Sequence, residues 1–129
     1  MGRKPRTVRV HSLTNQAVIA DKCHVAERFV DRLRGLIGRT HLALGEGMLF
    51  PRCNNIHTWF MRMSIDVVFV HAKKYGGGES IWVVSSVREC VSPWRVLPLM
   101  DGDSTETLEL PEGTVRRCVI NVGDELCIS

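Results

Sequence analysis

Residues 53–70 of this chain, CNNIHTWFMRMSIDVVFV, form its longest apolar-dominated stretch. In the last part, residues 65–70, the side chains follow the two-residue period of a strand. The odd-numbered residues would point to one face of a sheet and the even-numbered residues to the other. Apart from Asp66, both faces are apolar, as in a strand that is covered on both sides. The stretch therefore predicts a central strand that is buried on both faces.

Asp66 is the one carboxylate in this run, and a buried carboxylate is costly unless it is paired or hydrogen-bonded. Residues 56–61 also have the composition of a strand, and Arg62 and Ser64 make a polar break between the two runs. We therefore expect a hairpin in which His57 lies opposite Asp66. Asp66 would then hold the hairpin, either by accepting N–H groups of the turn or by pairing with His57 or Arg62.

The length of 129 residues fits one domain with a core of its own. We expect residues 1–6 to be a basic tail and residues 7–129 to form a single domain. The net charge is +3, and no basic run is interleaved with aromatic residues, so the composition argues against nucleic-acid binding. No apolar run is long enough to span a membrane and no secretory signal begins the chain, so we expect a cytoplasmic protein.

Short alternating runs separated by turn residues predict about eight strands. Residues 27–38 predict a helix, because apolar residues recur there every three or four positions and would cover one face or one end of a sheet. Residues 114–122 fit either a short helix or an irregular segment. The predicted fold class is mostly β (α+β), a compact β-sandwich or barrel-like domain with one amphipathic helix. The other predicted strands are residues 7–11, 17–20, 21–26, 48–50, 80–87, 105–110 and 125–128.

Several short motifs follow one another in a specific order: RGLIGR at 34–39, GMLF at 47–50, IDVVF at 65–69, LELPEG at 108–113 and GDEL at 123–126. This order resembles the domain of unknown function 192 family, a group of small uncharacterised prokaryotic domains, over roughly residues 8–128. The resemblance implies a compact β-rich fold with one helix. It implies no established activity, cofactor or catalytic residue, so we expect no cofactor.

The chain departs from the commonest form of that family in its central segment. Many members have Phe-Trp-Met-Lys-Asn-Thr before an Ile-Pro-Leu-Asp segment, where this chain has WFMRMSID at residues 59–66. It is similar instead to a variant with a cysteine and a histidine ahead of this segment. Many relatives carry export signals, which this chain lacks.

The residues Cys53, His57 and Asp66 are candidates for catalysis. A cysteine beside a histidine base that a carboxylate orients is the arrangement of a thiol nucleophile. Reactivity would also require a lowered thiol pKa, which the sequence does not show. The structural alternative is that Cys53 packs, His57 bonds to the main chain and Asp66 supports the turn. One hypothesis for function is therefore a small thiol-dependent hydrolase or transferase.

A metal site is not expected. The five cysteines form no CxxC pair, and no HxxxH spacing accompanies Cys53, His57, His71 or Cys90. An odd number of cysteines in a chain without a signal indicates reduced thiols rather than disulfide bonds.

The main hypothesis is a non-catalytic module that binds a small ligand or a protein segment. Aromatic faces beside guanidinium groups suit a carboxylate, a sugar or a peptide. Trp94, in Pro93-Trp94-Arg95, is the tryptophan that we expect to be exposed, whereas Trp59 and Trp82 fit the core. The candidate ligand-binding residues are Arg39, Arg62, Trp94 and Arg95. The oligomeric state is not indicated.

Overall fold

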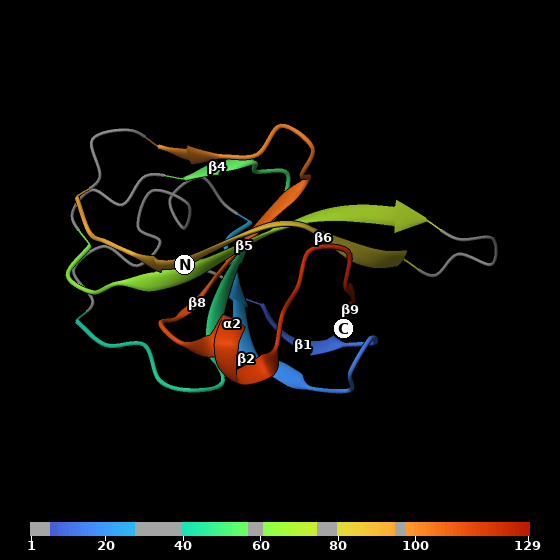
Figure 1. Ribbon diagram of the computed structural model, residues 1–129, viewed down its shortest axis with the longest axis horizontal. Coiled ribbons are helices and arrows are strands. Elements are labelled where there is room, and N and C mark those ends of the chain that lie inside the picture. Colours follow the sequence, from blue (N-terminus) through green and yellow to red (C-terminus); the bar gives the residue numbers. More distant parts are fainter. Residues whose placement is uncertain (1–5, 28–39, 57–60, 75–79, 95–97) are drawn as a thin grey trace, which may run out of the picture.

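The structure is a computed structural model, and it describes residues 6–27, 40–56, 61–74, 80–94 and 98–129. Its strands are β1 (Thr7–Ser12), β2 (Val18–Val25), β3 (Glu46–Phe50), β4 (Asn55–Ile56), β5 (Ile65–Lys74), β6 (Ser80–Val91), β7 (Leu99–Met100), β8 (Glu106–Pro111) and β9 (Glu125–Ile128). Seven of them close into a barrel in the order β1-β2-β3-β8-β5-β6-β9, and β9 pairs back with β1 (Figure 1). The remaining two, β4 and β7, pair as a separate ribbon. The protein is therefore mostly β, and it forms a barrel.

Strand β5 lies between β6 and β8 and is antiparallel to both. Leu110 of β8 lies directly opposite Asp66. The predicted hairpin between residues 56–61 and residues 65–70 is therefore wrong. Ile56 belongs to β4, which pairs with β7, while residues 57–60 lie outside the described part of the chain. The prediction failed because alternation shows which side chains share a face and not which strand lies alongside.

Both faces of β5 are buried, as its alternation predicts. Val68 and Val70 lie inside the barrel, in a core cluster to which all seven barrel strands contribute. The odd-numbered side chains lie on the outer face of the barrel, in a second cluster that the β4–β7 ribbon helps to cover. This second cluster comprises Leu42, Ile56, Met61, Ile65, Val67, Phe69, Val91 and Leu99, with Met48 and Met63 packed against it.

Strand β2 is continuous, so the prediction of two short strands at 17–20 and 21–26 is wrong. Asp21 and Lys22 are exposed, which means that these polar residues face solvent within a strand and do not mark a turn. Strand β2 pairs in parallel with β3, which requires a crossover connection. Residues 28–39 of this connection lie outside the described ranges, so the helix expected at 27–38 stays a prediction.

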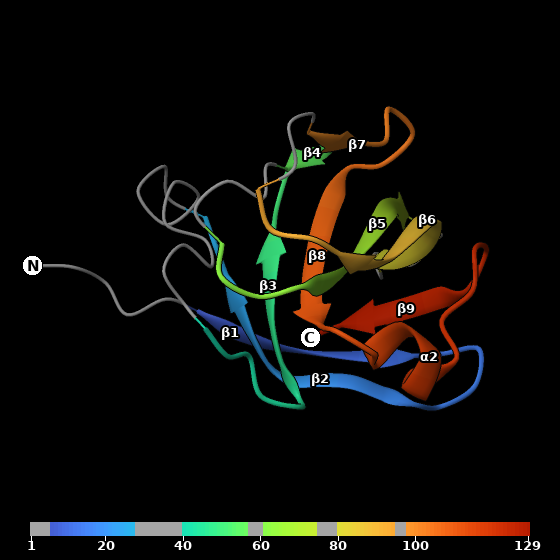
Figure 2. The same ribbon diagram turned by 60° about the vertical axis from the view of Figure 1, so that its left-hand side comes forward.

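The strands expected at 7–11, 48–50, 80–87, 105–110 and 125–128 are confirmed as β1, β3, β6, β8 and β9. Within residues 114–122 the helical alternative holds for α2 (Thr114–Cys118), whose buried residues pack against the core inside the barrel. Figures 1 and 2 place α2 and the β4–β7 ribbon on opposite sides of the barrel. Among the helices within the described ranges, none has the length and apolar character to span a membrane.

Candidate functional site

Asp66 is a fully buried carboxylate whose two oxygens accept hydrogen bonds from the main chain. Its Oδ1 accepts from the N–H of Cys90 at 3.0 Å. Its Oδ2 accepts from the N–H groups of Gly113 at 3.1 Å and Val115 at 2.9 Å. The prediction that Asp66 accepts main-chain N–H groups is confirmed. The donors, however, come from β6 and from the start of α2, and not from the turn before β5.

These donors are N–H groups that regular secondary structure leaves without a partner. Ile65 pairs with Val91 while Val67 pairs with Arg88, so β6 carries an extra residue opposite Asp66. This is a β-bulge, and a bulge interrupts the ladder of hydrogen bonds. The first N–H groups of a helix likewise have no acceptor within the helix. Asp66 therefore joins β5, the bulge of β6 and α2 at one point.

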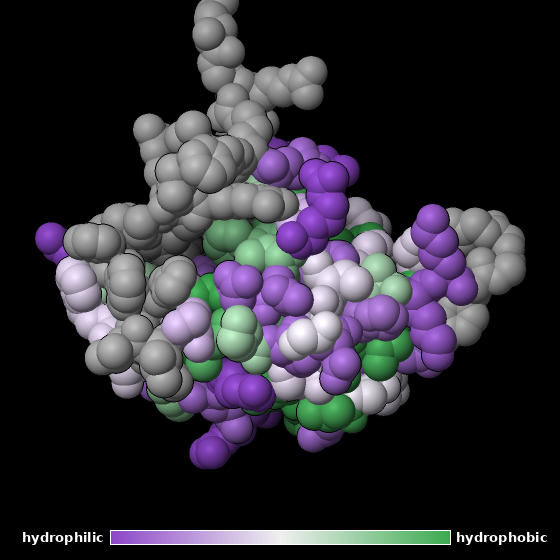
Figure 3. All heavy atoms as spheres, turned by 90° about the horizontal axis from the view of Figure 1, so that it is seen from above, coloured by the Kyte–Doolittle hydropathy of each residue, from purple (hydrophilic) through white to green (hydrophobic). Residues whose placement is uncertain are grey.

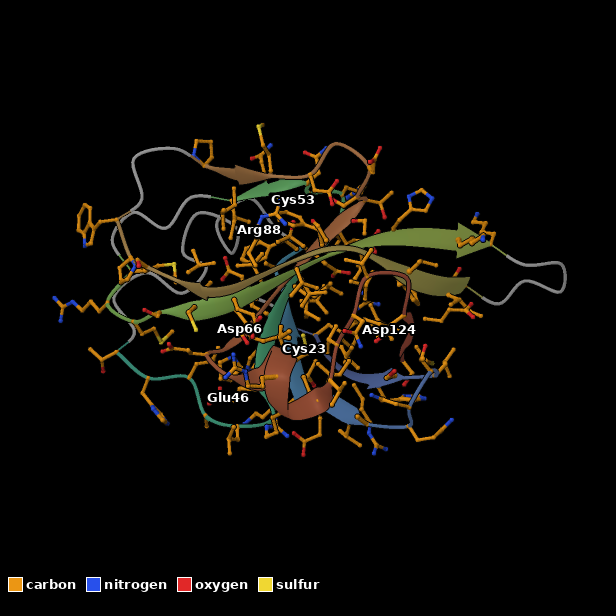
Figure 4. All side chains as sticks on the ribbon, viewed as in Figure 1. Cys23, Glu46, Cys53, Asp66, Arg88 and Asp124 are labelled. Carbon is orange, nitrogen blue, oxygen red and sulfur yellow. The ribbon has the colours of Figure 1, made fainter. Side chains whose placement is uncertain are left out.

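Cys53 lies on the outer face of the barrel. Its N–H donates to the carbonyl of Thr105 at 3.0 Å, and its carbonyl accepts from the hydroxyl of Thr107 at 2.7 Å. Its thiol donates to the carbonyl of Asn55 at 3.0 Å. Asp66 shares the inner face of β5 with Val68, and Figure 4 shows Cys53 and Asp66 on opposite sides of that strand. The structure therefore does not bring these two candidates together.

Three other predicted site residues, Arg39, His57 and Arg95, lie outside the described part of the chain. Arg62 and Trp94 are described, and both are exposed. Because Ile65 pairs with Val91 in antiparallel strands, the segment before β5 and the segment after β6 leave the barrel at the same end. Arg62 and Trp94 therefore lie at a common end of the β5–β6 pair.

The tryptophans differ in exposure, as expected. Trp94 is 59% exposed, and its backbone is left-handed, with φ 60°. Trp82 is partly buried against the core inside the barrel, and its indole N–H donates to the carboxylate of Glu106. Trp59 lies outside the described ranges. A left-handed backbone is rare for a bulky residue, so Trp94 has an unusual conformation as well as an exposed ring.

Glu109 is the residue that sequence reasoning missed. It lies in β8 between Met48 of β3 and Val67 of β5, both of which belong to or pack on the second cluster. It is 3% exposed, and its Oε2 has no hydrogen-bond partner among the described residues. Burial raises the pKa of Glu109 to about 8. The alternation of residues 105–110 predicts that Glu109 faces outward, opposite to Leu108 and Leu110, and a carboxyl that points outward is normally expected to meet water.

The β4–β7 ribbon covers part of the outer face on which Glu109 lies. Ile56 and Leu99 pack into the second cluster. The chain beyond the ribbon is attached to β6 by Asp101, whose Oδ2 accepts from the hydroxyls of Ser85 at 2.7 Å and Ser86 at 2.6 Å. The Ser86 hydroxyl in particular holds the pKa of the Asp101 carboxyl below its ordinary value. In Figure 3, which looks onto this side, hydrophobic and hydrophilic side chains of the described residues are interspersed.

The five cysteines carry free thiols in different surroundings. Burial raises the pKa of Cys23 to about 12, and a hydrogen bond to Glu112 raises the pKa of the exposed Cys90. Cys118 is buried, while Cys53 and Cys127 are partly exposed. Within the described ranges, no group of three or more histidine, cysteine or acidic residues is placed to hold a metal ion.

Two solved structures resemble the whole barrel. A protein from Sinorhizobium meliloti 1021, described as a candidate transcription regulator, superposes with a TM-score of 0.79 at 20% identity, over 99% of this chain and 98% of that one. A protein of unknown function from Novosphingobium aromaticivorans DSM 12444 superposes with a TM-score of 0.75 at 23% identity, over 95% of this chain and 84% of that one. At these identities the likeness shows a shared fold. No curated protein matches the sequence.

The sequence itself matches a family model over nearly its full length. The model is that of domain of unknown function 192, DUF192, described as an uncharacterized ACR, and it covers residues 10–128. The matched region contains six strands of the barrel in full, the second half of β1, the β4–β7 ribbon and the buried carboxyl groups of Asp66 and Glu109. This chain belongs to the DUF192 family.

Proposed function

We propose that this protein is a non-catalytic binding module that recognises a carboxylate-bearing segment of a partner through Arg62 and Trp94. The observation that carries the proposal is the left-handed φ of 60° at Trp94, an exposed bulky residue. Such backbone outliers cost free energy and gather at ligand clamps and other functional sites. An exposed indole held in this way offers a flat apolar face to a partner at a small cost in side-chain entropy.

Arg62 supplies the charge that the indole lacks. A guanidinium group binds a carboxylate through two parallel hydrogen bonds, which orients the bound group as well as attracting it. The net charge of +3 adds a weak long-range attraction for an acidic partner. Arg62 and Trp94 come from the two segments that leave one end of the β5–β6 pair, so a single acidic segment could contact both.

The proposal is tested by NMR titration of the labelled protein with a Glu-rich peptide and with a Lys-rich peptide of the same length. We expect amide shifts with the acidic peptide only, and a dissociation constant that rises at least fivefold in Arg62→Ala and in Trp94→Ala. Arg116→Ala is the matched control, because Arg116 is an exposed arginine of α2 and its loss changes the net charge equally. Equal binding by Arg62→Ala and Arg116→Ala would contradict the proposal.

The thiol-dependent hydrolase or transferase is the weaker alternative. The carboxylate of Asp66 already serves three main-chain donors, on the face of β5 opposite to Cys53. An acid engaged in this way has less capacity to orient a catalytic base. We also infer a cytoplasmic location, which the five free thiols support because reduced cysteines are typical of that compartment.

A further inference from the structure

The Glu109 carboxyl lies among apolar side chains of the described strands. Its cross-strand neighbours are Met48 and Val67, and the next residue along β5 on this face is Phe69. None of these three side chains can neutralise a carboxylate or donate a strong hydrogen bond to it. The nearest basic residue in the strand register is Arg88, which lies opposite Val67 on the far side of β5 and is exposed.

Buried polar side chains on β8 and on the neighbouring strand β5 have partners, whereas Glu109 Oε2 and, in α2, Thr114 Oγ1 have none among the described residues. Thr107, two residues earlier on the same face of β8, donates its hydroxyl to the carbonyl of Cys53 at 2.7 Å. Asp66, on the neighbouring strand, accepts three main-chain hydrogen bonds. Glu109 Oε2 has no such partner in the described part of the chain, although a leucine at this position would fill the apolar site without any polar cost.

We propose that Glu109 is the polar anchor of a second binding site, on the outer face of the barrel beneath the β4–β7 ribbon, for a small uncharged ligand with an amide group on an apolar body. A protonated carboxyl presents an O–H donor and a carbonyl acceptor side by side. A primary amide or a lactam presents the complementary acceptor and donor, so the two groups can form a pair of hydrogen bonds. The apolar body would contact the methionine and phenylalanine side chains of the second cluster.

An uncharged ligand fits this site better than an ion. A carboxylate brought beside Glu109 would be desolvated without a cation to balance it, and an ammonium group would have to give up its water among apolar side chains. Methionine side chains are flexible and adapt to irregular apolar groups. The second cluster contains Met61, and Met48 and Met63 pack against it.

The β4–β7 ribbon covers part of this face, so a ligand would enter by local opening of the ribbon. Within the described ranges, the ribbon pairs Asn55 with Met100 and Ile56 with Leu99. Segments with few backbone hydrogen bonds open at a lower free energy than the core strands beneath them. Figures 1 and 2 show the ribbon on the side of the barrel away from α2, and it is not one of the seven strands that close the barrel, so an outward movement of the ribbon would leave the barrel closed.

The test uses three probes of one shape and different charge: benzamide, benzoate and benzylamine. Binding to the full chain is measured by saturation-transfer difference NMR at pH 7 and pH 9. We expect benzamide alone to bind at pH 7 and its affinity to fall about tenfold at pH 9, because the carboxyl ionises above a pKa of about 8. Glu109→Gln, which keeps a donor and an acceptor, should bind benzamide equally at both pH values.

Glu109→Leu should lose benzamide binding while remaining folded, since leucine suits the apolar surroundings. Glu89→Gln is the matched control: it removes one exposed carboxylate of β6 and should bind as the parent does. Absence of benzamide binding to the parent at pH 7 would overturn the proposal. So would Glu109→Leu binding as tightly as the parent, or preferential binding of benzoate or benzylamine. If Glu109→Leu fails to fold, the test is benzamide binding by Glu109→Gln. Equal affinity at pH 7 and pH 9 supports the proposal, and a tenfold fall at pH 9, as in the parent, contradicts it.

Discussion

The carboxylate of Asp66 in β5 accepts a 2.9 Å hydrogen bond from the main-chain N–H of Val115, a residue 49 positions later in α2. The same oxygen accepts from Gly113, and the other oxygen accepts from Cys90 in the bulge of β6. One side chain thus joins the central strand to two places where the main chain would otherwise carry unpaired donors. This relationship makes Asp66 a structural residue of the barrel.

Asp66→Ala should lower the free energy of unfolding by about 3 kcal/mol, because it leaves buried N–H groups without an acceptor. Asp66→Asn should cost less, since the amide oxygen can still accept. Urea denaturation measures both variants. Asp103→Ala, at an exposed position, is the control and should change stability by less than about 0.5 kcal/mol. A stability of Asp66→Ala equal to that of the parent would disprove the structural role.

Glu109 should make the protein less stable as the pH rises from about 4.5 to about 8. Burial raises the pKa of Glu109 from 4.5 to about 8, so the folded state holds a proton that the unfolded state releases in this range. Each pH unit within it should cost about 1.4 kcal/mol of stability from this group. Urea denaturation of the parent and of Glu109→Gln at pH 5.5 and pH 7.5 tests this. The prediction is contradicted if the free energy of unfolding of the parent falls no more between pH 5.5 and pH 7.5 than that of Glu109→Gln.

Phe69→Ala should destabilise the protein by about 3–5 kcal/mol, because it leaves a cavity in the second cluster. Phe69 is fully buried on the outer face of the barrel. The control is Val122→Ala, at a position that is 66% exposed, which should change stability little. If Phe69→Ala lowers the free energy of unfolding by less than about 0.5 kcal/mol, the second cluster does not stabilise the fold as a buried core would. The periodicity of residues 27–38 also predicts that Leu33 belongs to the core, but Leu33 lies outside the described ranges.

The cysteines should differ in reactivity with iodoacetamide at neutral pH. Cys23 and Cys118 are buried and should label only on unfolding, and the raised pKa of Cys90 should slow its labelling. Cys53 and Cys127 are both partly exposed, so a non-catalytic protein should label them at comparable rates. Mass spectrometry of digested samples measures each site. Much faster labelling of Cys53, slowed by His57→Ala, would instead support the thiol-dependent alternative.

The sequence by itself determined which side chains of the central strand share a face. The two-residue period of residues 65–70 depends only on the geometry of an extended chain. It is therefore the same whichever strands lie beside β5. The need of Asp66 for hydrogen-bond donors also followed from local composition, because a carboxylate among β-branched residues has to be satisfied wherever the strand lies. The ordered motifs between residues 34 and 126 were likewise sufficient to indicate the family.

The tertiary structure alone decided which strands lie beside β5 and which buried carboxyl oxygen has no hydrogen-bond partner among the described residues. Alternation placed Glu109 outward, but its burial depends on Met48, on Val67 and on a ribbon built from β4 and β7, which are distant in sequence. The donors to Asp66 exist only because β6 bulges and α2 begins at the same point in space. Such contacts join residues tens of positions apart, and a local pattern carries no information about them because strand pairing is settled by the packing of the whole barrel.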